Sequence, residues 1–317
     1  LTADSNEATG LKWAAQSGGG GGITSDSDNN TVAGSNAGDS ITSGGTDNTF
    51  FGYNAGTAIT TSDRNAAFGS EALASATTAD NTCFGFQAGK NITSGSMNTC
   101  IGSRAGESIT TNQSNVCIGL FADTEGSYNV CVGQQAGQYS SGSYGVIIGG
   151  FTGQDVTGSN NNFIGYLAAK DATTATENVC IGRGSGRDLS SGKQNVIIGH
   201  DSANSGTNDL TTGDNNIIIG HDAAASSSSV DNEITLGDTN ISKFRVPGLN
   251  FELTPGIITL KNNGARSEVR WYCESSNAHY ASIKAPAHSD FSGDLTFVLP
   301  SSYGSSGQFL QSDGSGG

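Results

Sequence analysis

The sequence predicts an all-β fold, a β-solenoid of about thirteen stacked coils that is followed by a small β module. Three observations predict it. The chain has 47 glycines among 317 residues and is only 34% hydrophobic, too little apolar material for one thick globular core. A short apolar run closed by glycine recurs at an almost constant spacing, as in stacked repeat proteins. Both residues before that glycine are mostly apolar, which is typical of strands buried on two faces.

The glycine that closes each apolar run marks the repeat. Most copies are 16 or 17 residues apart, with one spacing of 14 and one of 21. Seventeen residues are too few for a pair of helices, but two short strands and two turns fit that length. The thirteen copies are Gly34, Gly52, Gly69, Gly85, Gly102, Gly119, Gly133, Gly149, Gly165, Gly182, Gly199, Gly220 and Gly237.

Other residue types keep a fixed distance from this glycine. Asparagine lies four residues before it in eleven copies, and Gly145 and Glu233 are the exceptions. Asparagine favours turns, tolerates a left-handed backbone and forms ladders when stacked, so we expect a corner there. A small residue follows three positions after the glycine, and a second apolar residue follows seven after it, on a second strand in the case of Ile109. Two successive copies define the structural repeat: Asn98, Cys100, Ile101, Gly102 and Ala105, then Asn115, Cys117, Ile118 and Gly119.

The apolar residues on both strand faces predict assembly. Neighbouring residues on a strand point to opposite faces, so two adjacent apolar residues indicate that both faces are buried. One face can fill the coil, whereas the other needs a cover that so thin a chain does not supply. We therefore expect further copies of the chain to pack around an axis.

Five of the six cysteines occupy one slot of the repeat, two residues before the glycine, where other copies carry isoleucine or phenylalanine. Stacked side chains that point the same way are poorly placed for disulfides, so we expect buried free thiols. A soft metal ion is the alternative, although no CxxC spacing supports it. Cys273 lies alone outside the repeat. The five cysteines are Cys83, Cys100, Cys117, Cys131 and Cys180.

Two histidine–aspartate pairs are the weak candidates for a metal site. The phrases "IIGHDSA" and "IIGHDAA" place His200 with Asp201, and His221 with Asp222, at equal slots of adjacent coils. Stacked imidazoles and carboxylates can hold Zn²⁺ or Ni²⁺, but they also occur as ordinary exposed polar residues. No catalytic triad, HExxH motif, phosphate loop or nucleotide fingerprint is present, so we expect neither an enzyme nor a cofactor.

The chain divides into four segments by composition. Residues 1–22 read as the end of an upstream connector with a glycine-rich linker, and residues 23–245 hold the repeats. Residues 246–303 contain short alternating segments that predict a small β-sandwich-like module, and residues 304–317 repeat the wording of the opening connector. A net charge of −15 argues against nucleic acid as a partner, and the lack of a long apolar span argues against membrane insertion.

The phrases "NTCIG", "NVCIG" and "NVIIG" resemble the head repeats of trimeric autotransporter adhesins over about residues 30–237. The heads of that family are trimers, so the resemblance implies a homotrimeric left-handed parallel β-roll. It also implies that residues one and three before the glycine, such as Ile101, lie inside each roll. The residue between them, such as Cys100, would then face the threefold axis. Longer coils, and the lack of an evident coiled-coil stalk or membrane anchor, depart from the family.

Phrases at both ends resemble tail fibres and related virion proteins of marine-type bacteriophages: "LTADSNEATGLKW", "ITLGDTNISKFRVPG", "HYASIKAPAHSDFSGDLTFVLP" and "GSSGQFLQSDGSGG". This resemblance implies a structural fibre segment of a virion, a rigid trimeric rod that supports host attachment. Its expected partners are other virion or fibre proteins and a glycan or protein of the host surface. The alternatives are the head domain of an adhesin on a bacterial cell surface and a glycan-degrading tailspike.

Overall fold

The computed structural model describes residues 23–204, 206, 208–246, 251–254, 257–260, 267–272 and 280–285. The chain forms two compact units, Leu1–Asn240 and Ile241–Gly317. The first unit contains the repeats, and the second contains the short segments that follow them. The connector predicted for residues 1–22 and the one predicted for residues 304–317 lie outside the described residues.

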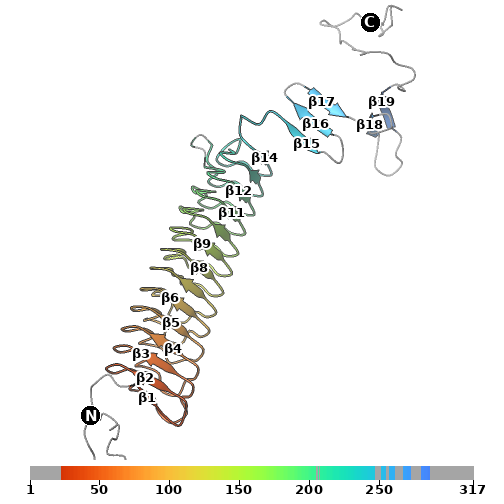
Figure 1. Ribbon diagram of the computed structural model, residues 1–317. Helices are drawn as coiled ribbons and strands as arrows, with labels where there is room; N and C mark the ends of the chain where they lie inside the picture. Colours follow the sequence, from red (N-terminus) through yellow and green to blue (C-terminus); the bar gives the residue numbers. More distant parts are fainter. Residues whose placement is uncertain are drawn as a thin grey trace, which may run out of the picture. The chain divides into compact units, whose positions relative to one another are not determined.

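The first unit is a β-solenoid, which confirms the predicted all-β repeat architecture (Figure 1). One short strand from each coil joins a single sheet, in which neighbours in sequence are neighbours in space. The first two strands pair antiparallel, and all later pairs are parallel. The strands are β1 (Thr24–Ser25), β2 (Thr31–Ala33), β3 (Thr49–Phe51), β4 (Ala66–Phe68), β5 (Thr82–Phe84), β6 (Thr99–Ile101), β7 (Val116–Ile118), β8 (Val130–Val132), β9 (Val146–Ile148), β10 (Asn162–Ile164), β11 (Val179–Ile181), β12 (Val196–Ile198), β13 (Ile217–Ile219) and β14 (Ile234–Leu236).

Every coil enters the sheet in the same register. Thr99, Cys100 and Ile101 of β6 pair with Val116, Cys117 and Ile118 of β7. From β2 to β14, the first, second and third residues of each strand pair in the same way with those of the next strand. Thirteen parallel strands enclose about twelve full turns, so the thirteen repeat glycines overcount the turns by one. The described residues contain no helix, and hence none of a length and apolarity that could span a membrane.

Each coil contributes one strand where the sequence predicted two. Ile109, which was assigned to a second strand, is fully buried but lies just after a turn, where its N–H donates to Gly106 O at 3.3 Å. The turn is tight because Gly102, Arg104 and Gly106 all have positive φ. Coils meet on this side through separate backbone hydrogen bonds, such as Gly106 N to Ala122 O at 2.9 Å, and not through a ladder.

The predicted orientation of the strand side chains was wrong. Cys100 is fully buried inside the coil, whereas Ile101 is 39% exposed on its outside. The reason is the buried Asn98, which points inward at the corner. Side chains alternate along a strand, so an inward residue at position 98 turns Cys100 inward and Ile101 outward. The interior there is also narrow, because a Cβ atom at Gly106 would overlap Cys100 Sγ.

The corner asparagines form the predicted ladder through the solenoid. The Asn98 side-chain oxygen accepts from both N and Nδ2 of Asn115, at 3.1 and 3.2 Å. Its own Nδ2 donates to Asn81 Oδ1 at 3.2 Å and to Asn112 O at 3.0 Å. Asn98 is fully buried, so each of these bonds is made without competition from water. Except at Gly145, the ladder links the corner of each coil to the next by side chains as well as by backbone.

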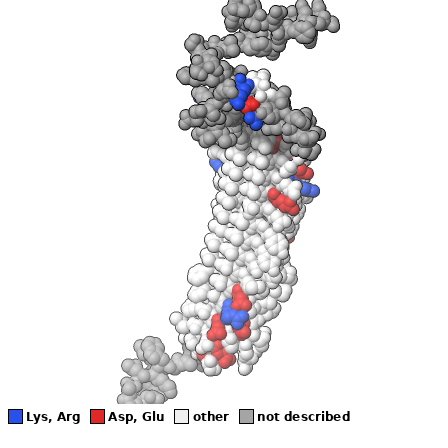
Figure 2. All heavy atoms as spheres, turned by 90° about the vertical axis from the view of Figure 1, so that its right-hand side faces the viewer, with Lys and Arg blue, Asp and Glu red and all other residues white. Residues whose placement is uncertain are grey.

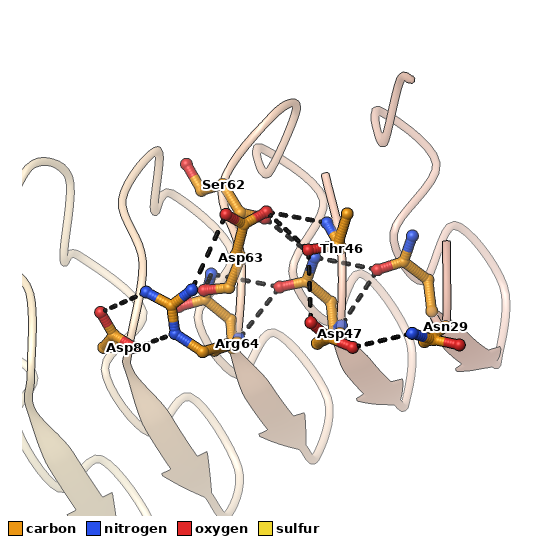
Figure 3. Close-up of polar contacts among 10 residues, drawn as sticks. Asn29, Thr46, Asp47, Ser62, Asp63, Arg64 and Asp80 are labelled. Carbon is orange, nitrogen blue, oxygen red and sulfur yellow. Dashed lines mark hydrogen bonds and ion pairs between the residues drawn. The ribbon is translucent and has the colours of Figure 1, made fainter. Parts of the chain in front are cut away.

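The left-handed backbone at the corner belongs to the residue before the asparagine, and not to the asparagine as expected. Asn29, Asp47, Arg64 and Asp80 hold this position in the first coils, with φ between 55° and 66° (Figure 3). No positive-φ residue in the described part is β-branched, as steric hindrance in this region requires. Their side chains interact along the corner: Asn29 donates to Asp47 at 3.1 Å, and Arg64 donates to both oxygens of Asp80 at 2.6 and 3.0 Å.

The repeat glycines are required where neighbouring coils come closest. Gly102 has φ of 135°, a conformation open only to glycine, and a Cβ atom there would lie 2.5 Å from Gly119 O. The Gly119 N–H donates to Ile101 O at 2.8 Å, so this approach is part of the hydrogen bonding between coils. Ala105, three residues later, is fully buried, and its small side chain likewise allows neighbouring coils to approach closely.

The core is interrupted where the ladder is interrupted. Gly145 N donates to Asn129 Oδ1 at 2.8 Å, but Gly145 has no side-chain oxygen to offer to the Asn161 N–H. A cavity of about 10 Å³, close to the volume needed by one water, opens beside it. The buried apolar residues fall into two clusters at this point, the first ending at Ile147 and the second starting at Val156.

The described residues of the second unit form two small antiparallel sheets. The prediction of a β-sandwich-like module over residues 246–303 stays a prediction, because only these segments of it are described. The three-stranded sheet contains β15 (Phe244–Val246), β16 (Phe251–Thr254) and β17 (Ile257–Leu260), and the two-stranded sheet contains β18 (Glu268–Tyr272) and β19 (Tyr280–Lys284).

Replacing Asn98 with alanine is expected to destabilise the solenoid by about 3 kcal/mol, because it removes the acceptor of the buried Asn115 N–H and the donor to Asn112 O. Asn91→Ala is the matched control, since exposed Asn91 makes only one bond, to Glu107 O. Guanidinium unfolding followed by circular dichroism measures both variants. Equal midpoints for the two would contradict a structural role for the ladder.

Gly145→Asn is expected to stabilise the chain by about 1 kcal/mol, because it restores an acceptor for Asn161 and fills the cavity. A Cβ atom at Gly145 would lie 3.1 Å from Asn129 Oδ1, which is tight but is accommodated if the neighbouring carboxamide moves slightly. Gly145→Ala separates the two contributions, since it adds the Cβ atom without the hydrogen bonds. A rise in the unfolding midpoint that is equal in both variants would rule out the ladder as its cause.

Candidate functional site

The first and third residues of strands β2–β14 point away from the coil interior and form one continuous surface, here called the outer strand face. The third residue is apolar in every one of these strands, and neither position carries a charge in any of them. Ile101, Ile181 and Ile219 remain 39%, 37% and 38% exposed. Twelve steps of about 4.8 Å give this face a length of roughly 58 Å.

Aromatic side chains stack along the outer strand face. Phe51 and Phe68 lie 5.0 Å apart between ring centroids and are almost parallel, at 3°. Phe68 and Phe84 lie 4.6 Å apart at 18°. Phe84 is 50% exposed even so. Stacking in register reduces the apolar area in contact with water, but it leaves the outward side of the ladder open to a partner.

Charged side chains gather in separate places on the solenoid. Figure 2 shows one side of it, where the charges form small groups toward the two ends and the surface between them is uncharged. One pair near the N-terminal end is Arg64 with Asp80, joined at 2.6 Å, and another is Lys90 with Glu71, at 2.5 Å. Exposed pairs of this kind contribute little to stability. Both pairs lie outside the outer strand face, which itself carries no charged side chain.

The second copy of the structural repeat behaves like the first. Asn115 and Cys117 are fully buried, Ile118 is partly exposed on the outer strand face, and Gly119 has φ of 136°. Leu210 occupies the second apolar position of the coil with the 21-residue spacing, and it is fully buried. These residues recur at equivalent places in successive coils, and the sequence misjudged which of the strand residues face inward.

The five repeat cysteines are buried and free, as predicted. A hydrogen bond with Cys100, together with burial, holds the pKa of Cys83 and of Cys117 well above the usual range, and burial alone raises the pKa of Cys180. Cys83, Cys117 and Cys180 are poor nucleophiles in this state. Hydrogen bonds with Cys117 and Cys83 instead lower the pKa of Cys100. All five side chains pack in the coil interior. Cys273 lies outside the described residues.

The structure brings the two histidine–aspartate pairs together. The rings of His200 and His221 stack with centroids 5.1 Å apart and 10° between their planes. In each pair the histidine Nδ1 lies 3.1 Å from an oxygen of the following aspartate. One ring nitrogen from each histidine and a carboxylate oxygen of Asp222 all lie within 4.8 Å of one another.

Asp123 is a buried polar residue that the sequence analysis missed. It lies four residues after Gly119, where several coils carry a glycine, in the coil shortened to a spacing of 14 residues. Its carboxylate accepts from the backbone N–H of Ser108 at 2.9 Å and of Thr124 at 2.8 Å. Thr124 is fully buried beside it, so polar groups replace the apolar residue that this coil lacks. The short spacing was the signal that could have revealed this substitution.

No family model matches the chain, and no curated protein or solved structure is significantly similar to it.

Stability is expected to rise as the pH falls from 8 to 5, because burial raises the pKa of Asp123 from 3.8 to about 7. The folded state then binds this proton more tightly than the unfolded state does. The resulting stabilisation is complete below the unfolded pKa and is lost as the pH rises through 7. Thermal unfolding of the protein and of Asp123→Asn measures the effect. The variant should lack this component of the pH dependence, and identical pH profiles would contradict the assignment.

Proposed function

We propose that the chain is a structural segment of a virion fibre, a homotrimeric, left-handed β-solenoid rod that supports attachment to a host cell. The observation that carries the proposal is the outer strand face. It is uncharged, carries an apolar residue at the third position of every strand, and is roughly 58 Å long in a chain with a net charge of −15. A surface of this extent on a monomer would exceed the apolar patches that soluble proteins usually expose.

Further copies of the same chain suit this face best. Its residues repeat at every coil step, so a parallel copy in register presents apolar side chains at every height of the rod. Because the face carries no charge, the acidic remainder of each chain stays in water when the copies meet. Closed rotational symmetry then buries the outer strand face of every copy to the same extent. The number three and the left hand of the coil rest on the resemblance to trimeric adhesin heads.

The fibre function follows from rigidity and repetition. Backbone bonds and the asparagine ladder join each coil to the next, so the rod holds its ends at a fixed separation. Three copies present any host-contact surface three times, which raises avidity without tighter single contacts. The assignment to a virion rests on the phrases shared with phage fibre proteins. An adhesin head on a bacterial cell surface is the second candidate, since it would use the same rod.

Sedimentation equilibrium tests the assembly. The protein is expected to have three times the 32.1 kDa mass of the chain. Ile101→Asp should lower this mass at equal concentration while leaving the circular dichroism spectrum unchanged, because Ile101 lies outside the coil core. Tyr139→Asp is the control: its side chain is 58% exposed in a turn rather than on the outer strand face. A monomeric wild type, or equal dissociation of both variants, would refute a trimer held by this face.

Immuno-electron microscopy tests the location. Antibodies against residues 23–240 should label the appendages of phage particles. Labelling confined to the surface of bacterial cells would favour the adhesin instead.

A further inference from the structure

We propose that His200, His221 and Asp222 form a binding site for a divalent transition metal ion of the Zn²⁺ or Ni²⁺ class. The three side chains offer two imidazole nitrogens and a carboxylate oxygen, all within 4.8 Å of one another. Such mixed nitrogen and oxygen sets suit these ions. The inference is independent of the proposed trimer and of the virion assignment, because all three residues lie in one chain.

The fold places the ligands by repetition. His200 and His221 directly follow Gly199 and Gly220, and strands β12 and β13 pair in register, with Ile198 opposite Ile219. Equivalent positions in adjacent coils are therefore one strand spacing apart, which stacks the two rings at 5.1 Å. The arrangement is set by the sheet and does not depend on a flexible loop.

The aspartates lie where they can support the histidines. Asp201 and Asp222 have positive φ, of 49° and 52°, and these turns direct each carboxylate back toward the preceding ring. In the tautomer whose Nδ1–H donates across the 3.1 Å to the carboxylate, Nε2 carries the lone pair that can bind a metal ion. The two carboxylates also supply negative charge to compensate a divalent cation.

Only small movements would close the site. Ligand atoms around a tetrahedral Zn²⁺ with bonds of about 2.0–2.1 Å lie about 3.3 Å apart. From separations of 4.8 Å or less, side-chain rotation can reach this distance, because His221 is 68% exposed and Asp222 is 45% exposed. Asp222 also lines an open hollow of about 560 Å³ together with Asp238, so water can complete the coordination.

Arg183 lies in the preceding coil, and its positive charge would repel a metal ion bound at this site. Its Nη1 lies 3.2 Å from His200 Nε2 and 3.2 Å from an oxygen of Asp201. The guanidinium therefore places a positive charge at the edge of the site and engages one of the two carboxylates. Removing that charge should strengthen metal binding, an effect that a merely solvated group of polar side chains would not produce.

Zinc titration of the full chain by isothermal calorimetry tests the proposal. The wild type is expected to bind one Zn²⁺ per chain at this site, and His200→Ala, His221→Ala and Asp222→Asn should each bind it at least about tenfold more weakly. Arg183→Gln should bind it several-fold more tightly. Circular dichroism checks that these exposed substitutions leave the solenoid folded.

The other two histidines provide the control. His279→Ala combined with His288→Ala should leave the affinity of this site unchanged. Absence of zinc binding by the wild type would overturn the proposal. Equal affinity of His221→Ala and the wild type, or loss of binding only in the His279 and His288 double variant, would overturn it as well.

Discussion

The buried carboxamide at each corner is the interaction on which the rest of the structure depends. Asn98 gives hydrogen bonds to the coil before it and to the turn that follows, and receives two from the coil after it. A side chain that must face inward to make these bonds determines the direction of every residue that follows on the strand. A shift of one residue would carry the asparagines into water and turn the outer residues of each strand into the coil interior. The ladder therefore specifies the register of the whole sheet.

The close approach of neighbouring coils follows from the same register. Glycine at the bend brings successive backbones so close that no side chain fits between them. The inward position of the strand holds a cysteine in some coils and a fully buried residue such as Phe50, Phe163 or Ile197 in others. The third residue of each strand points the other way and lies on the outer strand face. Where a coil is shortened, the buried space is filled by hydrogen-bonded Asp123 and Thr124 rather than left empty. The outward direction of the third residue of each strand thus leaves a surface suited to a partner.

Much of this could be predicted from the sequence, because stacking forces equivalent residues to recur at equivalent positions. The coil positions, the asparagine ladder and the free cysteines all followed from that recurrence. The direction of Ile101 and Cys100 did not, because alternation cannot distinguish inside from outside when both faces are apolar. The buried corner residue was the missing information. The expected second strand failed because positive-φ residues at every second position, such as Gly102, Arg104 and Gly106, form a turn in its place. The meeting of His200 with His221 was predictable, since equal slots in adjacent coils must be neighbours.

The constant step between strands sets how the length of the rod depends on the number of residues in the chain. One coil of about 17 residues advances the rod by about 4.8 Å, whereas the same residues in a single α-helix would extend about 25 Å. The solenoid therefore uses roughly five times as much chain per unit length. The extra chain goes into breadth, and the resistance of a beam to bending rises steeply with its breadth. Insertion or loss of one repeat would change the reach of the rod in increments of a single strand spacing while leaving its cross-section intact.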